Sequence, residues 1–198
     1  MKRLLSAITM AATMLFVAPL AQATIITYYA DLSGLNESPS NASPGTGSAT
    51  VIYDDALHTM QVKATFSGLI GNTTAAHIHC CTLAPMTGTV GVATPTPTFP
   101  GFSLGVTSGT YDTTFDMTLA SSYNASFVTA SGGTAAGAEA ALFAGMSAGK
   151  AYFNIHTTFV PSGEIRGFLA AQAVPEPGSL ALIGLGLAGL AFRRRKKA

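Results

Sequence analysis

The heptapeptide MQVKATF, residues 60–66, alternates apolar and polar side chains without a break. Successive side chains of an extended strand point to opposite faces, so the four apolar residues would share one face and the three polar residues the other. An amphipathic helix would instead repeat its apolar residues every three or four positions. The stretch therefore predicts a β-strand that is buried on one side.

Shorter stretches on both sides of the heptapeptide repeat this signal. They are rich in β-branched and aromatic residues and end at turn-forming residues; they cover residues 27–32, 50–53, 111–119, 152–157 and 164–169. One helix is expected over residues 135–147, where Leu142, Phe143 and Met146 fall on one side. Many short strands with one short helix predict an all-β fold, an antiparallel β-sandwich of the immunoglobulin-like or Greek-key kind.

Two internal segments, residues 39–48 and 85–109, are expected to be loops. The second is long and contains several prolines and glycines, and long loops in compact domains commonly carry function. It follows the stretch AAHIHCC at residues 75–81 directly, so we expect it to cover that stretch.

The N-terminal 23 residues have the layout of a secretory signal peptide. A basic start is followed by an apolar run over residues 4–20 and by Ala21-Gln22-Ala23, which predicts an apolar signal helix that signal peptidase cuts after Ala23. The alternative is an uncleaved N-terminal anchor, which Pro19 and the small residues before the cut disfavour.

The C-terminal segment, residues 174–198, begins with Val174-Pro175-Glu176-Pro177, continues as an apolar stretch and ends in five basic residues. The apolar part, residues 179–192, would form a helix of about 21 Å, short of the roughly 20 residues that a permanent membrane anchor needs. Basic residues stay on the cytoplasmic side, so the body of the chain would face outward. A plain tail anchor is the alternative, but it does not explain Pro-Glu-Pro.

Residues 24–173 remain as one domain, and their charge differs from that of the whole chain. The full sequence carries a formal charge of +1, but this domain has three basic and eight acidic residues, hence −5. A charge-poor, acidic domain has no electrostatic footprint for nucleic acid and no basic patch for anionic lipid. We therefore expect no nucleic-acid partner.

Three histidines on two predicted strands form the main candidate site. His77 and His79 would point to one face, and Cys81 would join them if the strand continued. Asn154 and His156 would also share a face, and Glu164 lies in the strand after them. Imidazole and thiolate bind copper and zinc well, so a metal site is one hypothesis, provided that the three imidazoles converge.

The alternative is that these histidines are ordinary strand residues, hydrogen-bonded to backbone and hydroxyl groups. A His-x-His spacing alone is weak evidence for a metal. The remaining histidine, His58, stands beside Asp54 and Asp55 at an apparent turn and is expected to be solvated.

The only two cysteines, Cys80 and Cys81, are adjacent. They could form a vicinal disulfide, bridge two chains or remain reduced; export to an oxidising compartment favours the vicinal pair. That pair would compete with Cys81 as a metal ligand, since the thiolate is the form that binds. A Cys–His nucleophile lacks any accompanying nucleophile elbow or oxyanion turn. We therefore expect no catalytic residues and a protein that is not an enzyme.

The C-terminal Val-Pro-Glu-Pro, Gly-rich apolar stretch and basic tail resemble the PEP-CTERM sorting signal of Gram-negative bacteria. That resemblance implies a tail that an exosortase-type enzyme removes, and a frequent association with exopolysaccharide. It predicts an exported protein that is briefly anchored in the inner membrane by the apolar segment and then released to the cell surface or beyond.

The domain itself resembles the CHRD domain, named from chordin. The resemblance rests on four pieces in the family's order: DLSGLNESP at 31–39, FSGL at 66–69 leading into TAAHIH at 74–79, AYFNIHT at 151–157, and SGEIRG at 162–167. It implies an extracellular β-sandwich with no established catalytic activity. The chain departs from the family at Cys80-Cys81, where a small residue is usual, and in the long proline-rich stretch that follows.

Together these patterns predict a secreted or surface-associated, non-catalytic binding or structural protein of the bacterial envelope or extracellular matrix. Its partners would be exopolysaccharide or other envelope proteins. The alternative is a copper- or zinc-binding protein whose ligands are His77, His79 and His156, assisted by Glu164 or Cys81.

Overall fold

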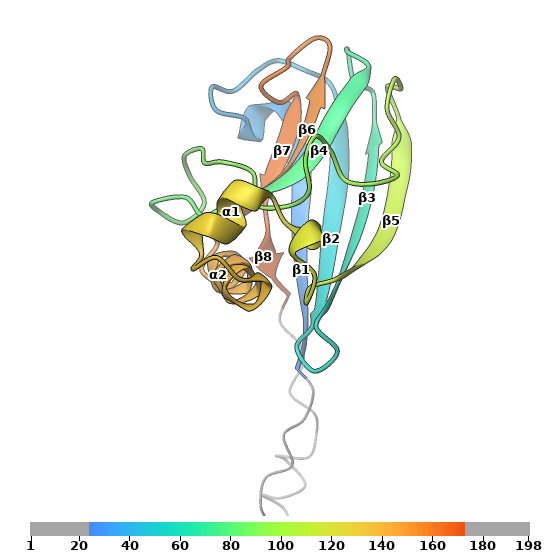
Figure 1. The fold of residues 1–198 in the computed structure, drawn as a ribbon. Coiled ribbons are helices and arrows are strands. Elements are labelled where there is room, and N and C mark those ends of the chain that lie inside the picture. Colours follow the sequence, from blue (N-terminus) through green and yellow to red (C-terminus); the bar gives the residue numbers. More distant parts are fainter. Residues whose placement is uncertain (1–23, 173–198) are drawn as a thin grey trace, which may run out of the picture.

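The structure is a computed structural model and describes residues 24–172. One antiparallel sheet dominates it, with the strand order β4-β6-β7-β1-β2-β3-β5 and the short β8 paired to β1. Its strands are β1 (Ile25–Ser33), β2 (Thr46–Asp54), β3 (Thr59–Ser67), β4 (Thr73–Cys80), β5 (Gly109–Asp116), β6 (Ala151–Thr157), β7 (Ile165–Phe168) and β8 (Ala170–Ala171). The predicted all-β, antiparallel class is confirmed, and the continuous sheet curls into a half-barrel around the core (Figure 1).

The heptapeptide at residues 60–66 lies in β3, between β2 and β5. Its four apolar side chains are at most 4 % exposed and point into the core. Its polar residues alternate with them on the other face. The period-two pattern therefore placed both the strand and its buried face correctly.

The long loop between β4 and β5, residues 81–108, runs along the free edge of β4 and closes the sheet there. The amides of Ala93 and Phe99 donate to the carbonyls of Ile78 and Ala76. Phe99 is fully buried and stacks on Phe153 of β6. Because the loop supplies both edge hydrogen bonds and core side chains, it is part of the fold.

Two α-helices lie beside the lower half of the sheet in Figure 1, α1 (Ala125–Ala130) and α2 (Ala135–Ser147). Helix α2 has the predicted bounds and buries Leu142 and Met146 in the core. The structure also has α1, which the sequence analysis missed, and the short 3₁₀ helices η1 (Gly34–Asn36) and η2 (Ala120–Ser122). Helix α1 is only one and a half turns long and starts at Asn124, whose side chain accepts from the Ser126 amide.

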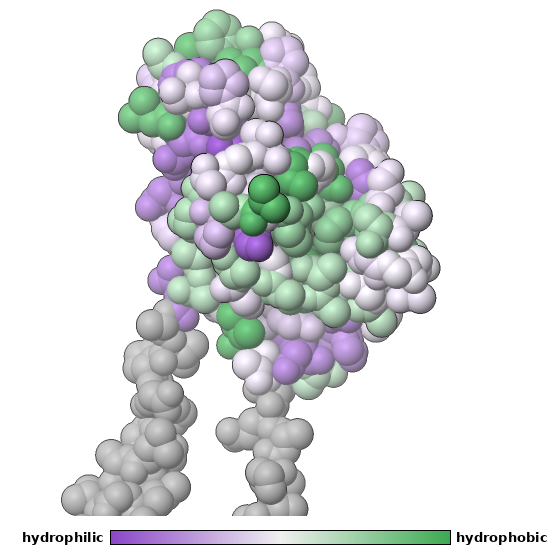
Figure 2. All heavy atoms as spheres, turned by 90° about the vertical axis from the view of Figure 1, so that its left-hand side faces the viewer, coloured by the Kyte–Doolittle hydropathy of each residue, from purple (hydrophilic) through white to green (hydrophobic). Residues whose placement is uncertain are grey.

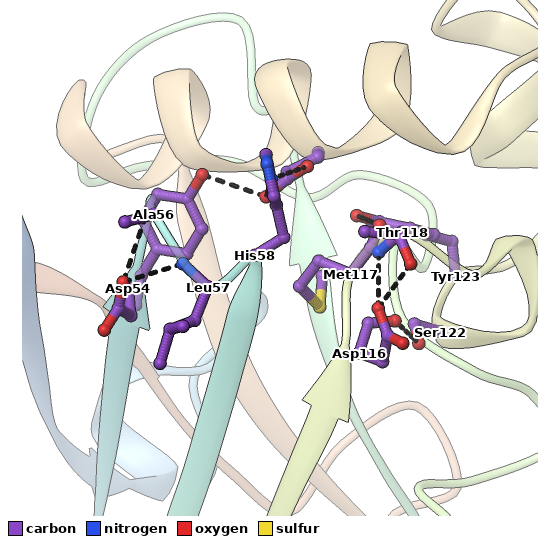
Figure 3. A network of polar contacts seen from close by, with 11 residues as sticks. Asp54, Ala56, Leu57, His58, Asp116, Met117, Thr118, Ser122 and Tyr123 are labelled. Carbon is purple, nitrogen blue, oxygen red and sulfur yellow. Dashed lines mark hydrogen bonds and ion pairs between the residues drawn. The ribbon is translucent and has the colours of Figure 1, made fainter. Parts of the chain in front are cut away.

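The turn between β2 and β3 is held against α2 by polar contacts (Figure 3). The Nδ1 atom of His58 lies 3.0 Å from both carboxylate oxygens of Glu139, and the Tyr53 hydroxyl donates to the same carboxylate. Tyr53 also stacks on Phe143 of α2. The sequence analysis expected His58 to be solvated; its side chain is 51 % exposed, but it is paired.

Two of the expected boundaries differ from those in the structure. The strand expected over residues 111–119 ends at Asp116, whose carboxylate accepts from the Thr118 amide and hydroxyl (Figure 3). The loop expected over residues 39–48 ends where β2 begins at Thr46. Within residues 24–172, no helix is long and apolar enough to cross a membrane. The expected signal helix and C-terminal apolar helix fall outside the described residues.

Candidate metal centre

The three candidate histidines lie on the outer face of β4 and β6, away from the core. Ile78 and Cys80 of β4 point into the core, so His77 and His79 point outward. On β6, His156 and Asn154 take the outer face in the same way. The two strands are direct neighbours, with His77 opposite Asn154.

The three imidazoles converge, which the metal hypothesis required. The ring of His77 lies 5.8 Å from that of His79 and 5.2 Å from that of His156, centroid to centroid. One nitrogen atom from each ring lies within 4.8 Å of the chosen nitrogens of the other two. A tetrahedral metal with bonds of 2.0–2.1 Å would bring these nitrogens to about 3.3 Å from one another. The observed limit of 4.8 Å exceeds this spacing, so a bound metal would have to draw the rings closer together.

Backbone carbonyls orient each ring. His77 donates from Nε2 to the Pro97 carbonyl at 2.7 Å, and His79 donates from Nδ1 to the Val90 carbonyl at 2.8 Å. His156 donates from Nδ1 to the Pro161 carbonyl at 3.0 Å. A carbonyl can only accept, so the bonded nitrogen of each ring carries the proton and the other nitrogen keeps a free lone pair.

Those other nitrogens are buried and lack hydrogen-bond partners among residues 24–172: Nδ1 of His77, Nε2 of His79 and Nε2 of His156. Buried polar atoms are nearly always satisfied in native proteins, so an unpartnered one calls for an explanation. Three of them in one cluster, each with its tautomer set by a carbonyl, match the way metal-ligating histidines are held.

Burial keeps the three rings neutral. It lowers the pKa of His77 and of His79 to about 4, although the hydrogen bonds to Pro97 and Val90 oppose the shift. It also lowers the pKa of His156. Neutral imidazole, with its free lone pair, is the form that can act as a metal ligand.

Glu164, an expected helper of the histidines, is not part of their cluster. Its carboxylate is fully buried and accepts four hydrogen bonds, from the hydroxyls of Ser43 and Thr157 and from the amides of Ile70 and Gly71. Burial raises its pKa, but these four bonds outweigh burial and hold the pKa below its ordinary value. Glu164 therefore holds the turn that follows β3.

Cys81 is also absent from the cluster. Strand β4 ends at Cys80, and the two cysteines form a vicinal disulfide on the core side of the sheet, against α2. The sulfur of Cys81 lies 3.5 Å from the Ala141 carbonyl oxygen. The expected alternation fails after Cys80 because the chain leaves the sheet there, so Cys81 no longer faces the same side as His79.

Three residues around the histidines were not expected as part of the site. Tyr152 stacks on His79 at 4.8 Å with an interplanar angle of 4°, and the Arg166 guanidinium lies 4.7 Å from the Tyr152 ring centroid. Glu37 reaches this face from the segment after η1, with a carboxylate oxygen 3.7 Å from the Arg166 Nε. Period-two alternation on β6 already placed Asn154 and Tyr152 with His156; no local pattern pointed to Glu37.

A groove opens beside the histidine cluster, between the η1 segment and the loop after β4. Its volume is about 610 Å³, and its walls include Tyr29, Asp31, Glu37, Arg166 and Phe168. Figure 2 faces this side of the molecule and shows hydrophilic residues gathered in the hollow between the upper lobe and the rest of the domain. Glu37 and Arg166 thus border both the groove and the histidine face.

The fold and the site define an antiparallel β-domain with a histidine cluster on the outer face of its sheet. The chain matches the CHRD domain family over residues 28–169, and a PEP-CTERM protein-sorting motif matches residues 173–196. The chain therefore belongs to the CHRD domain family. The motif indicates export and sorting by an exosortase-type system in a Gram-negative bacterium. No curated protein and no solved structure matches the chain.

Proposed function

We propose that this exported CHRD protein is a non-catalytic binding protein of the envelope or extracellular matrix that holds one copper or zinc ion through His77, His79 and His156. One observation carries the proposal: the three histidines each offer a nitrogen within 4.8 Å of the others, and each ring has a buried nitrogen without a hydrogen-bond partner in the described part of the chain. A single cation bound to all three would satisfy every one of them.

The simpler interpretation, that these are ordinary strand histidines, leaves those nitrogens unexplained. Each buried acceptor without a partner costs about 1–3 kcal/mol. His77 and His79 are 6 % and 8 % exposed, so bulk solvent offers little compensation. Hydrogen bonds to the carbonyls of Pro97, Val90 and Pro161 fix the tautomer of each ring, so that the proton is on the bonded nitrogen and the other nitrogen has a free lone pair. Hydrogen bonds of this kind typically orient metal ligands.

The ligand chemistry favours copper or zinc over magnesium or calcium. Neutral imidazole nitrogen suits zinc and copper, whereas the harder cations prefer oxygen ligands. The Arg166 guanidinium lies over the Tyr152 ring, which stacks on His79, and it is paired with Glu37. The three-nitrogen set therefore supports a d-block cation.

Metal content of the mature protein, purified after export and analysed by mass spectrometry, tests this proposal. We expect one zinc or copper ion per chain, reloadable after removal with a chelator. His77→Ala/His79→Ala should lose the ion, whereas His58→Ala, which removes the one histidine outside the cluster, should keep it. Wild-type protein that stays below about 0.1 ion per chain after incubation with either metal would overturn the proposal.

A second candidate function is the binding of a saccharide polymer in the groove. Phe168 and Tyr29 offer ring surfaces beside the polar groups of Asp31 and Arg166, and sugars bind to such combinations of aromatic faces and hydrogen-bonding groups. Affinity electrophoresis through gels that contain the host's exopolysaccharide would test it. We expect retardation that Phe168→Ala abolishes and that His77→Ala/His79→Ala leaves unchanged; equal mobility with and without polymer would contradict it.

A further inference from the structure

Two buried polar atoms besides the three histidine nitrogens also lack partners in the described part of the chain. Within residues 24–172, five buried side-chain nitrogen or oxygen atoms lack a hydrogen bond; three are those imidazole nitrogens, and the others are Oδ1 of Asn154 and Oε1 of Glu37. Both are oxygen acceptors. A cation held by the imidazoles alone would leave these two oxygens without a donor.

Asn154 stands at the centre of the histidine face. It is paired with His77 on β4 and with Arg166 on β7. His156 lies two positions further along β6, and His79 stands opposite Tyr152, two positions back. Nevertheless the rings of His79 and His156 approach to 5.7 Å, so they lean toward each other over Asn154. The position of Asn154 on the outer face is therefore flanked by the strand positions of the three histidines.

The carboxylate of Glu37 reaches the same space through a gap that a glycine leaves. A Cβ atom on Gly163 would lie 2.6 Å from Oδ1 of Asn154 and 2.7 Å from Oε1 of Glu37. Both oxygens thus border the small volume above Gly163. The other carboxylate oxygen of Glu37 faces Arg166, whose guanidinium donates to the Asn36 and Gly88 carbonyls and is therefore fixed.

We propose that the metal keeps an open fourth position, filled by an exchangeable water molecule that donates its two protons to Asn154 Oδ1 and Glu37 Oε1, and that small inorganic anions can replace this water. The inference rests on the three-histidine metal site proposed above. A metal-bound water supplies the two donors that the buried oxygens lack. Three protein ligands plus a water is the arrangement of zinc sites that bind exogenous ligands.

Direct ligation by either oxygen fits the geometry less well. Glu37 is tethered to Arg166 on the β7 side, whereas His77 and His79 stand on β4, beyond β6. An amide oxygen such as that of Asn154 is a poor ligand for zinc or copper compared with nitrogen or sulfur. Glu37 and Arg166 also line the groove that opens to solvent on this side, and in this proposal the small ligand enters there.

Cobalt(II) substitution followed by azide titration tests the inference, because cobalt reports its coordination in the visible spectrum. We expect the metal-depleted mature protein to take up one cobalt per chain and to show a saturable spectral change with azide. Glu37→Gln should bind azide about tenfold more tightly, because it weakens an acceptor of the competing water and removes a negative charge. Asn154→Ala should change the affinity in the same direction.

The controls separate failure of this inference from failure of the metal site. Asn72→Ala removes an exposed asparagine that is not part of the cluster and should leave azide affinity unchanged. One cobalt per chain with no response to azide would mean a closed site and would overturn the inference alone. Azide affinity that is equal in wild type, Glu37→Gln and Asn154→Ala would overturn the roles of both residues. Failure to take up cobalt, zinc or copper would overturn the metal site and this inference with it.

Discussion

Glu164 is fully buried, and its carboxylate accepts four hydrogen bonds. Two of its donors are backbone amides, of Ile70 and Gly71, which cannot turn away. The other two are the hydroxyls of Ser43 and Thr157. Glu164 thereby joins three segments that are distant in the chain, which explains why an acidic residue is tolerated at a fully buried position.

We predict that Glu164→Gln destabilises the domain by roughly 2–4 kcal/mol, because one carboxylate oxygen becomes an NH₂ group that faces a hydrogen-bond donor. Urea unfolding followed by circular dichroism would measure the loss. Asp112→Asn serves as the control: Asp112 is exposed and pairs loosely with Lys63 at 3.8 Å, so its change should stay below about 1 kcal/mol. Equal losses in the two variants would contradict the structural role of Glu164.

The buried histidines make stability depend on pH. In the unfolded chain His77 and His79 would take up protons near pH 6.5, but in the folded domain only near pH 4. Between these values the unfolded state binds more protons than the folded state. The contribution of the two histidines to folding stability is therefore fully present above pH 6.5 and is lost as the pH falls toward 4. Each unit of depression corresponds to about 1.4 kcal/mol.

We therefore predict that metal-free wild-type protein loses a few kcal/mol relative to His77→Gln/His79→Gln between pH 6.5 and pH 4. Burial raises the pKa of Glu37 to about 7, against the opposing effect of Arg166. Its contribution to folding stability therefore grows as the pH falls, opposite to that of the histidines. Glu37 is present in both proteins, and the comparison cancels its contribution. Urea midpoints measured across this interval would check the prediction, and parallel curves for the two proteins would contradict it.

At the level of elements, helix α2 and the end of strand β4 meet at a glycine. Gly145 is buried, and a Cβ atom there would overlap the sulfur atoms of both Cys80 and Cys81. The disulfide therefore packs directly on the helix backbone. This contact explains a glycine in the last turn of α2, although alanine has a helix propensity higher by up to about 1 kcal/mol.

We predict that Gly145→Ala destabilises the domain by about 1–3 kcal/mol, because overpacking outweighs the gain in helix propensity. In a Cys80→Ala/Cys81→Ala background the same substitution should be neutral or stabilising, since the obstructing sulfurs are gone. A double-mutant cycle in urea would measure this coupling. The same loss in both backgrounds would show that the sulfurs are not the obstacle.

At the level of the whole molecule, both ends of the described chain lie at one end of the sheet (Figure 1). The Gln172 amide donates to the Thr27 carbonyl at 2.7 Å, and the Thr24 amide donates to the Asp55 carboxylate at 2.7 Å. Residues 1–23 and 173–198 are therefore joined to the domain at the same end of the sheet. The histidine face lies on strands β4 and β6, at one edge of the sheet.

We predict that the surface form of the protein begins at Thr24 and lacks the basic C-terminal end, because the first 23 residues have the layout of a signal peptide and the C-terminal segment matches a sorting motif. Replacement of Pro175, Glu176 and Pro177 by alanine should leave the tail uncut and the protein in the membrane fraction. N-terminal sequencing and intact mass of the surface fraction would check this. A surface form that retains Arg193 in the wild type would contradict it.

Local patterns in the sequence determined the strands, the faces of their side chains and the export signals. Alternation along β4 and β6 placed His77 with His79 and Asn154 with His156, because a strand's covalent geometry sends every second side chain to the same side. Helix α2 followed from its apolar side and the glycine after it. The same reasoning failed at Cys81, where the chain leaves the sheet.

Only the tertiary structure decided what those faces meet. It put β4 beside β6, brought Glu37 within 3.7 Å of Arg166 and assigned Glu164 to a structural turn instead of the histidine cluster. Arg166 and the Asn36 carbonyl to which it donates are 130 positions apart in the chain. Alternation depends only on residues that are neighbours in the chain, so it can be read from the sequence. Convergence depends on which distant segments the curled sheet and its closing loop pack together, because burial of the core, and not sequence proximity, selects those contacts.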